Sequence, residues 1–373
     1  MLLTALGMAD HGHVVTVACQ SGGRLESRAR AAGLRVRSLS FGGDLHLGAI
    51  LGLARVLRDE KPDVVHAHDP HATAAGVLAA RLGGRPRVVA SRRVTLRLRG
   101  ALSRRKYLAC DRLIPVSRAV THRLIEDGLP FERLTLVYEG VPDRLPTAEP
   151  WEVLEGLGLP PGSPVIGNVA ALTEHKDHKT LLLAMPRVLE AVPGARLVIV
   201  GEGKLRARLE SQARERGLGE RCLFTGFRDD VDRLLPGFSL LCLTSRLEGL
   251  GTSLLDAMCF SRPIVAAATG GIPEAVRHGE TGLLVPVGDP SALAVALVAL
   301  LRDEGRRVLM GQAGRRRFEQ TFTADRMVEE TLRVYEEVCG SLAVLERLPG
   351  IRAFEPGVAL TTLTRGQEAP SEG

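Results

Sequence analysis

The feature that most constrains this chain is a regular alternation of short apolar runs with longer segments of helical pattern. In the first block, β-branched apolar runs predict strands at residues 14–19, 63–67, 87–91, 113–116 and 134–137. Helical patterns such as 45–59 and 71–82 separate these runs. Apolar strands that alternate with helices form parallel sheets covered on both faces, so the sequence predicts an α/β fold.

The same alternation returns after a segment rich in Pro and Gly, residues 142–164. Strands are predicted there at residues 165–170, 195–200, 222–225, 240–243, 263–267 and 282–285. Two such blocks predict two Rossmann-like domains that face each other across a cleft, at residues 1–145 and 163–322. Residues 346–373 are polar and rich in Pro, Gly and Glu, so we expect a mobile tail.

The start of the chain departs from this pattern. A Rossmann-like unit begins with a strand and a Gly-rich loop that leads into a helix. Here Met1 opens directly on a helical pattern, and the first apolar run follows only at Val14. We therefore expect an N-terminal domain that lacks its first strand, with the neighbouring strands unpaired, and a natural start upstream of Met1.

The charge of the chain is unevenly distributed. Of the 49 basic residues 44 are Arg, and residues 85–123 hold twelve basic side chains and one acid, a net charge of +11 that leaves −5 for the rest. A local basic surface suggests an anionic partner, such as an anionic membrane or acceptor, although a solvated face is an equally good interpretation. Nucleic acid is not expected, because the chain has only 13 aromatic residues and no recognisable binding module.

Segments that would place the chain in a membrane or an oxidising compartment are not evident. The six cysteines are far apart and form no C-x-x-C pair, which favours reduced thiols and a cytoplasmic protein. No apolar stretch reaches the length of a membrane span, and no signal-peptide pattern opens the chain. The predicted location is cytoplasmic, with the basic stretch allowing peripheral contact with the inner face of the membrane.

The strongest motif follows the predicted strand at 240–243. Two carboxylates, Glu248 and Asp256, lie eight positions apart, the first in a strand–helix loop and the second inside the helix. Between them Gly251, Thr252 and Ser253 place backbone N–H groups at a helix N-terminus, which is a favourable site for a diphosphate. The alternative is an N-capping Ser253 and a solvated acid on a helix face.

This segment resembles the E-x7-E motif of family-four retaining glycosyltransferases, which have the GT-B fold. Further pieces that are similar to this family lie at residues 195–203, 224–230, 269–274 and 279–285, and more loosely at 13–16, 62–69 and 114–117. The resemblance implies transfer of a sugar from a nucleotide-sugar donor, without a metal or other cofactor. It also implies a C-terminal helix at 323–345 that returns to the N-terminal domain.

The resemblance assigns donor-side roles. Glu248 would contact the sugar hydroxyls, and Asp256, where the family has a second Glu, would bind the ribose. The phosphates would be held by the amides of Leu250, Gly251, Thr252 and Ser253, and the segment at 224–230 would contribute Phe227 and Arg228. Lys176 aligns with the lysine of the family's G-R-L-x-x-x-K pattern, but Ala171 stands where the arginine should be. A second cation is expected to compensate, because the leaving phosphate must be neutralised. The alternative for Lys176 is an exposed loop lysine.

The acceptor side is predicted in the first block. His66, His68 and Asp69 stand at the end of a predicted strand, where open α/β sheets place ligands. A structural role and a metal site are the second and third interpretations. Arg93 falls where many family members have a histidine near the sugar, and it would stabilise phosphate or acceptor charge instead.

Together these observations predict a metal-independent retaining glycosyltransferase that acts on a cell-envelope, exopolysaccharide or lipid-linked acceptor. Two alternatives remain: a nucleotide-sugar epimerase of the same architecture, and a degenerate protein that binds nucleotide sugars without catalysis. A dehydrogenase is disfavoured because no G-x-G-x-x-G follows an early strand.

Overall fold

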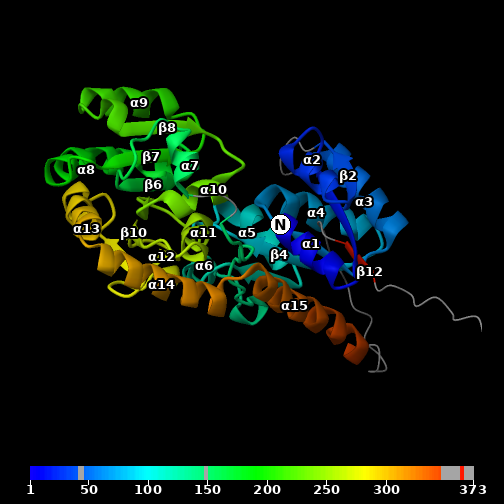
Figure 1. The fold of residues 1–373 in the computed structure, drawn as a ribbon. Helices are drawn as coiled ribbons and strands as arrows, with labels where there is room; N and C mark the ends of the chain where they lie inside the picture. The colour runs from blue at the N-terminus through cyan, green and yellow to red at the C-terminus, as the bar shows by residue number, and fades with distance from the viewer. Residues whose placement is uncertain (41–45, 147–149, 346–361, 365–373) are drawn as a thin grey trace, which may run out of the picture. The chain divides into compact units, whose positions relative to one another are not determined.

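The computed structural model describes residues 1–40, 46–146, 150–345 and 362–364 (Figure 1). The chain divides into two compact units. Unit 1 consists of Met1–Glu139 together with the segment that follows residue 323, and unit 2 is Gly140–Thr323. Each unit is built around one six-stranded sheet. No helix in these described ranges is long and apolar enough to cross a membrane.

The sheet of unit 1 has the strand order β2-β1-β12-β3-β4-β5. Its strands are β1 (Val14–Gln20), β2 (Arg35–Leu39), β3 (Val64–Ala67), β4 (Arg87–Arg92), β5 (Arg112–Pro115) and β12 (Thr362–Thr364). All neighbours pair in parallel except at β12. The strand predicted at 134–137 is wrong: Leu134 makes only an isolated bridge to Leu113 of β5.

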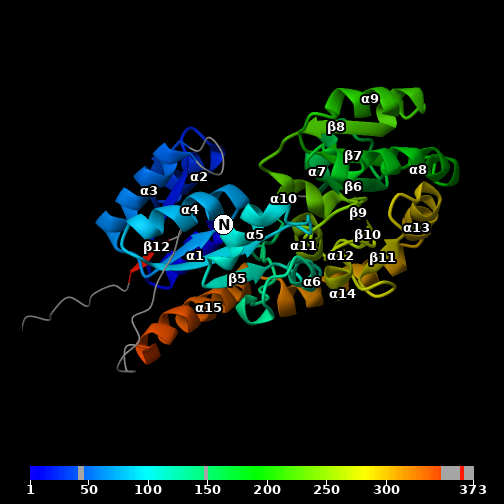
Figure 2. The same ribbon diagram turned by 180° about the vertical axis from the view of Figure 1, so that it is seen from behind.

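Helices cover both faces of this sheet. They are α1 (Leu2–Asp10), α2 (Arg24–Ala31), α3 (Leu47–Glu60), α4 (Pro70–Leu82), α5 (Gly100–Leu108), α6 (Arg118–Glu126) and α15 (Ala324–Leu345), with a 3-10 turn η1 (Phe131–Arg133). Val64 of β3 packs in a core with α1 and α15, whereas Val65 packs in another with α3 and α4. Successive side chains of a strand point to opposite faces, so a continuous apolar run buries both. Figure 2 shows α15 running along unit 1, where it packs against α1.

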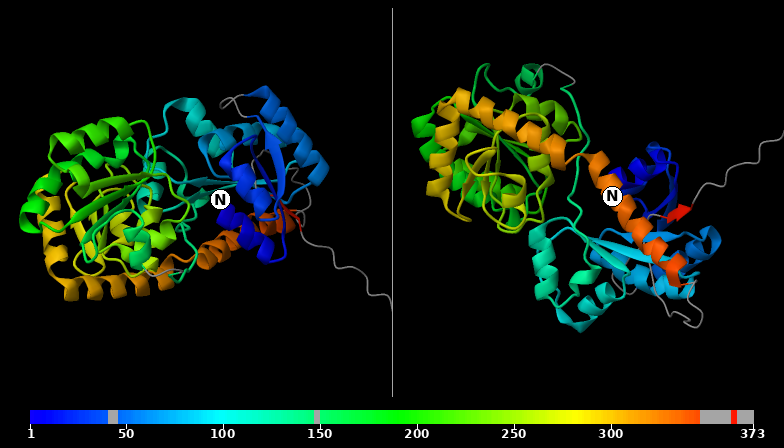
Figure 3. Two further views of the ribbon diagram at one scale, coloured as in Figure 1. Left: turned by 45° about the horizontal axis from the view of Figure 1, so that its top comes forward. Right: turned by 90° about the horizontal axis from the view of Figure 1, so that it is seen from below.

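The place between β1 and β3 is occupied, which corrects the expectation that the neighbouring strands are unpaired. Strand β12, the red arrow in Figure 3, comes from the last part of the chain. It pairs antiparallel with β1 over three residues and with Val64 of β3. The strands that flank the expected gap are therefore paired. Strand β12 (Thr362–Thr364) belongs to the segment 346–373, for which we expect a mobile tail; the other residues of that segment lie outside the described ranges.

The sheet of unit 2 is parallel throughout, in the order β11-β10-β9-β6-β7-β8. Its strands are β6 (Val165–Val169), β7 (Arg196–Val200), β8 (Cys222–Gly226), β9 (Leu240–Leu243), β10 (Ile264–Ala267) and β11 (Gly282–Val285). Each of the six was predicted within one residue at either end. The strand order reverses between β6 and β9, and ligands of open α/β sheets bind beyond the carboxyl ends of strands at such a switch point.

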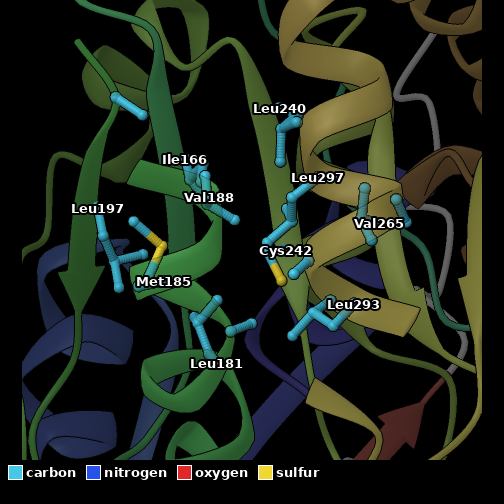
Figure 4. Close-up of a cluster of buried hydrophobic side chains, with 14 of the residues drawn as sticks. Ile166, Leu181, Met185, Val188, Leu197, Leu240, Cys242, Val265, Leu293 and Leu297 are labelled. Atoms are coloured by element: carbon cyan, nitrogen blue, oxygen red, sulfur yellow. The ribbon is translucent and has the colours of Figure 1, made fainter. Parts of the chain in front are cut away.

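The helices of unit 2 are α7 (Pro150–Glu155), α8 (His178–Ala191), α9 (Arg206–Glu215), α10 (Val231–Leu234), α11 (Thr252–Cys259), α12 (Ile272–Ala275), α13 (Pro290–Arg302) and α14 (Glu304–Thr321). Three 3-10 turns complete them: η2 (Glu174–Lys176), η3 (Gly219–Arg221) and η4 (Leu235–Gly237). Figure 4 shows how Met185 of α8 and Leu297 of α13 pack with sheet residues such as Cys242. The buried core behind the sheet gives the loops at its carboxyl edge a rigid base.

Candidate functional site

Two predicted site residues meet at the switch point of the unit 2 sheet. Lys176 lies in η2 after β6, Glu248 lies in the loop after β9, and Nζ of the lysine is 2.5 Å from Oε2 of the glutamate. Both side chains are largely buried, with 18% and 13% of their surfaces exposed. The Ser245 hydroxyl donates a hydrogen bond to the same carboxylate oxygen at 3.1 Å. Lys176 is therefore not an exposed loop lysine.

The loops that carry this ion pair are fastened to each other. The Thr244 hydroxyl donates to the carbonyl oxygens of Lys176 and Asp177 at 3.1 and 3.0 Å. The Arg246 N–H donates to the carbonyl oxygen of His175 at 2.8 Å, and its guanidinium pairs with Asp177 at 2.9 Å. The two loops follow adjacent parallel strands, so residues 72 positions apart in the sequence come into contact.

The N-terminus of α11 begins beside Glu248. Gly251 is its N-cap, with a φ of +91°, and provides no side chain to accept from the first turn. The first backbone bond runs from Leu254 N–H to the Gly251 carbonyl, and within the described ranges the N–H groups of Thr252 and Ser253 have no partner. The interpretation of Ser253 as the N-cap is wrong. Free N–H groups at a helix N-terminus attract anions.

A tight turn after β10 holds the backbone of Glu248. Gly270 has a φ of +52°, and a Cβ on it would lie 1.9 Å from the Glu248 carbonyl oxygen. The Gly271 N–H donates to this oxygen, and the Thr269 hydroxyl donates to the Arg246 carbonyl oxygen at 2.9 Å. Only glycine fits at position 270, because any side chain would collide with the site loop.

Asp256, the second carboxylate of the motif, lies on α11 and is paired with a residue that sequence reasoning missed. Arg144 Nη2 is 2.5 Å from Asp256 Oδ1, and 22% of the Asp256 side chain is exposed. Burial raises the pKa of this carboxyl to about 6, although the nearby Arg144 guanidinium lowers it. Asp256 is thus a buried, paired acid rather than a solvated one. No motif marks Arg144, and only the folded chain reveals its contact.

Phe227 and Arg228 stand apart from this arrangement. The Arg228 guanidinium donates two hydrogen bonds to Asp230, at 2.8 and 2.6 Å, and this contact raises its pKa. Phe227 is 45% exposed. In the described part of the chain, the ion pair of Arg228 is with Asp230 and not with Glu248. Ala171 is exposed, and Arg246 is the further cation that the fold adds beside η2.

The predicted acceptor residues of unit 1 divide into two roles. His66 is buried, with Nδ1 2.6 Å from the Tyr335 hydroxyl oxygen and Nε2 2.7 Å from the Ser91 hydroxyl oxygen. Both ring nitrogens are occupied, so His66 serves the packing of α15 on β3 and β4. Asp69 is the N-cap of α4 and accepts from the His71 and Ala72 N–H groups at 2.8 Å.

His68 has an unused ring nitrogen. Its ring stacks on His66 with 4.0 Å between centroids, and Nδ1 lies 3.5 Å from Nη2 of Arg93. Nδ1 therefore accepts, which places the proton of a neutral ring on Nε2; this atom is buried and has no partner in the described ranges. Burial, together with positive charge nearby, holds the pKa of His68 well below its usual range. Arg93 is paired with Glu139.

His68 borders a cavity of about 540 Å³ at the carboxyl ends of β1 and β3. Cys19, Arg24, Asp69 and His71 also line it. Within the described ranges no three His, Cys, Asp or Glu side chains are grouped so as to hold a metal ion. The unit 1 cavity therefore presents a neutral histidine among both polar and apolar side chains, the latter including Met1 and Leu25.

Comparisons with known proteins identify the family of this chain. The chain matches the family Glycosyl transferases group 1 over residues 151–317 and the family Glycosyltransferase Family 4 over residues 1–145. It is 30% identical to 2-deoxystreptamine N-acetyl-D-glucosaminyltransferase of Streptomyces fradiae, over 70% of this chain and 68% of that one. It is 26% identical to N-acetyl-alpha-D-glucosaminyl L-malate synthase of Bacillus anthracis, over 77% of each chain.

Solved structures show the same fold. HepE of Anabaena, crystallised in complex with UDP and glucose, superimposes with a TM-score of 0.80 at 20% identity, covering 90% of this chain and 95% of that one. Sucrose-phosphate synthase of Thermosynechococcus elongatus gives a TM-score of 0.76 at 19% identity, covering 91% and 92%. The two α/β units are thus those of a GT-B fold. The chain belongs to the group 1 glycosyl transferases of the family-4 type, and it is a glycosyltransferase.

Proposed function

We propose that this enzyme transfers a sugar from a nucleotide-sugar donor to a hydroxyl of its acceptor with retention of the anomeric configuration. The observation that carries the proposal is the Lys176–Glu248 pair beside the N-terminus of α11, at the switch point of a parallel sheet. A buried cation, a carboxylate and free backbone N–H groups converge there. This combination suits a ligand with both a diphosphate and sugar hydroxyls.

The chemistry of each protein group suggests which part of the donor it binds. Lys176 and the N–H groups of Thr252 and Ser253 bind the diphosphate, since all three donate hydrogen bonds and carry positive or partial positive charge. Glu248 accepts hydrogen bonds from the sugar hydroxyls, and Asp256 accepts from the ribose. The relative HepE was solved with UDP and glucose, which supports a nucleotide sugar as the donor class.

The reaction follows from where charge develops. The bond between the anomeric carbon and the diphosphate oxygen breaks, and Lys176 with the α11 amides stabilises the negative charge that the leaving oxygen acquires. The acceptor hydroxyl attacks from the same face and gives its proton to that oxygen. The products are the glycosylated acceptor, with retained configuration, and the nucleoside diphosphate. In this proposal the side chains and amides neutralise the phosphate, and no metal ion is required.

The acceptor is proposed to bind in the unit 1 cavity. His68, which is neutral at neutral pH, borders this cavity together with Asp69, so the cavity offers polar side chains to an acceptor hydroxyl. A saccharide or lipid-linked acceptor of the cell envelope fits this role. Transfer is preferred over epimerisation, because the similar proteins named above are transferases and synthases.

A screen of nucleotide sugars for release of free nucleoside diphosphate tests the proposal, with EDTA present in one arm. The variants are Lys176→Ala and Glu248→Gln, and Lys179→Ala, an exposed lysine three positions away, is the matched control. We expect release to fall at least about 100-fold in Lys176→Ala, the loss typical of a removed oxyanion donor. Release should also fall in Glu248→Gln, because the sugar hydroxyls lose a charged acceptor. Lys179→Ala and the EDTA arm should match the wild type. Equal turnover by Lys176→Ala would refute the site, and loss with EDTA would refute metal independence.

A further inference from the structure

A second cavity of unit 1 lies between α4 and α5, and α5 belongs to the basic stretch at residues 85–123. Its volume is about 770 Å³. Val77 and Leu78 of α4 and Leu102 of α5 give it an apolar lining, and Arg81, Arg99 and Arg105 add three guanidinium groups. None of the described lining residues is acidic. The cavity therefore combines a hydrocarbon-like surface with concentrated positive charge.

Exposed leucines occur on the two helices of this groove and in the segment that precedes α5. Leu102 is 76% exposed, and in the neighbouring segments Leu82 is 57% and Leu96 is 53% exposed. Single exposed leucines are normal, but several in adjoining segments, next to an apolar groove, mark a surface that gains from leaving water. Their burial against hydrocarbon contributes about 1.5–3 kcal/mol for each side chain that is fully covered.

The arginines of the groove differ from other basic residues of the same stretch. Arg87 pairs with Asp111 at 2.7 Å, and Arg123 pairs with Glu126 at 2.5 Å. Arg81, Arg99 and Arg105 take part in none of the ion pairs formed in the described part of the chain. Positive charge is thus left uncompensated at the place where the apolar surface is exposed. A ligand that matches both features has an anionic head and a hydrocarbon body.

We propose that the groove between α4 and α5 docks the enzyme on an anionic membrane by taking up a phospholipid. The arginines bind the lipid phosphate, for which their planar groups are well suited, and Leu102 enters the acyl region. A soluble saccharide would leave the apolar lining unused, and a nucleic acid would require stacking aromatic side chains that the groove lacks. The membrane is therefore the occupant that accounts for both features.

Vesicle flotation of the full-length chain tests the proposal without measuring sugar transfer. The two vesicle types are phosphatidylcholine alone and phosphatidylcholine with phosphatidylglycerol. We expect binding only to the anionic vesicles, with affinity that falls as salt rises. Each arginine near an anionic surface raises partitioning about fivefold, so the double variant Arg99→Glu/Arg105→Glu should lose at least about 25-fold.

A matched control separates the groove from net charge. Arg187→Glu/Arg214→Glu makes the same charge change on exposed positions of α8 and α9 in unit 2, and it should float like the wild type. Leu102→Asp, which keeps every arginine, should also lose binding, and thermal melting checks that each variant is folded. Equal loss in both arginine double variants would overturn the proposal. So would equal binding to neutral vesicles, no binding to either type, or a Leu102→Asp variant that binds like the wild type.

Discussion

Replacing Asp256 with asparagine is expected to stabilise unit 2 at neutral pH while weakening the binding of the nucleotide. The carboxyl group is largely buried against Arg144, and its pKa is about 6 in the folded protein. In an unfolded chain the pKa of an aspartate is about 3.9. At pH values between about 4 and 6, the carboxyl group of Asp256 is therefore protonated in the folded enzyme and ionised in the unfolded chain. An acid kept ionised at such a cost is typical of a functional site.

The magnitude follows from the difference between the two pKa values. One pKa unit corresponds to about 1.4 kcal/mol, so the ionised carboxylate lowers the free energy of unfolding by about 3 kcal/mol at pH 7.5. The loss develops as the pH rises from about 4 to 6, because the folded state binds more protons in this window. Asparagine has nearly the same shape as the protonated acid. The pKa of Asp256 in the folded protein already includes the attraction of Arg144. The free energy of unfolding of the asparagine variant should therefore exceed that of the wild type by the full difference of about 3 kcal/mol.

The assay is urea unfolding followed by tryptophan fluorescence at pH 4.5 and 7.5. The single tryptophan, Trp151, belongs to α7 of unit 2, so the signal reports on the unit that contains Asp256. Asp256→Asn should exceed the wild type by only about 1 kcal/mol at pH 4.5 and by about 3 kcal/mol at pH 7.5. Glu280→Gln removes a surface carboxylate that is 53% exposed and should change stability by less than about 1 kcal/mol at either pH.

Two results would refute this reasoning. A variant that is no more stable than the wild type at pH 7.5 would show that Asp256 is not ionised at a cost. A gain of equal size at both pH values would show that packing rather than charge is responsible. Nucleotide binding gives a separate measure, because loss of a charged acceptor for the ribose should weaken binding about tenfold.

Three further substitutions test individual contacts. Gly270→Ala should reduce nucleotide release at least about 100-fold in the donor screen, because its Cβ would overlap the Glu248 carbonyl oxygen. The circular dichroism spectrum of an α/β protein should persist. Turnover at the wild-type rate would contradict the close approach of Gly270 to Glu248. Tyr335→Phe should lower thermal stability by about 1–3 kcal/mol, since it leaves a buried nitrogen of His66 without a partner, and an unchanged melting temperature would show that the bond is dispensable. Asp69→Ala should lower the free energy of unfolding by about 1 kcal/mol and Asp69→Ser by less, as expected for an N-cap, whereas an equal loss in both would indicate another role.

The sequence predicted the sheet of unit 2 well because each of its strands is a buried apolar run bounded by turns. The sequence-based prediction of strands failed where residues are buried without pairing in a sheet, or pair in a sheet without being buried. Leu134 and Val137 are buried, yet their segment passes beside β5 as a loop with a single bridge. Strand β2 (Arg35–Leu39) went unnoticed because it lies at the sheet edge, where its polar residues remain exposed.

The site was predictable only in part. The spacing of Glu248 and Asp256 and the register of Lys176 are local patterns, and parallel neighbouring strands bring Lys176 to Glu248. The partner of Asp256 is a tertiary contact with Arg144, which no local pattern marks. Strand β12 is a similar case: three residues near the end of the chain pair with strands at its beginning, and nothing in their sequence distinguishes them.

Calorimetric titration with nucleotides tests the central claim most directly, namely that Lys176 and the α11 N-terminus form a diphosphate site. The titrants are a nucleoside diphosphate and the corresponding nucleoside without phosphate, and the proteins are the wild type, Lys176→Ala and Lys179→Ala. A charge-assisted hydrogen bond contributes about 1.5–3 kcal/mol, so Lys176→Ala should bind the diphosphate about 10- to 150-fold more weakly. Binding of the nucleoside should not change, and Lys179→Ala should match the wild type. Unchanged diphosphate affinity in Lys176→Ala, or equal losses in both lysine variants, would contradict the account.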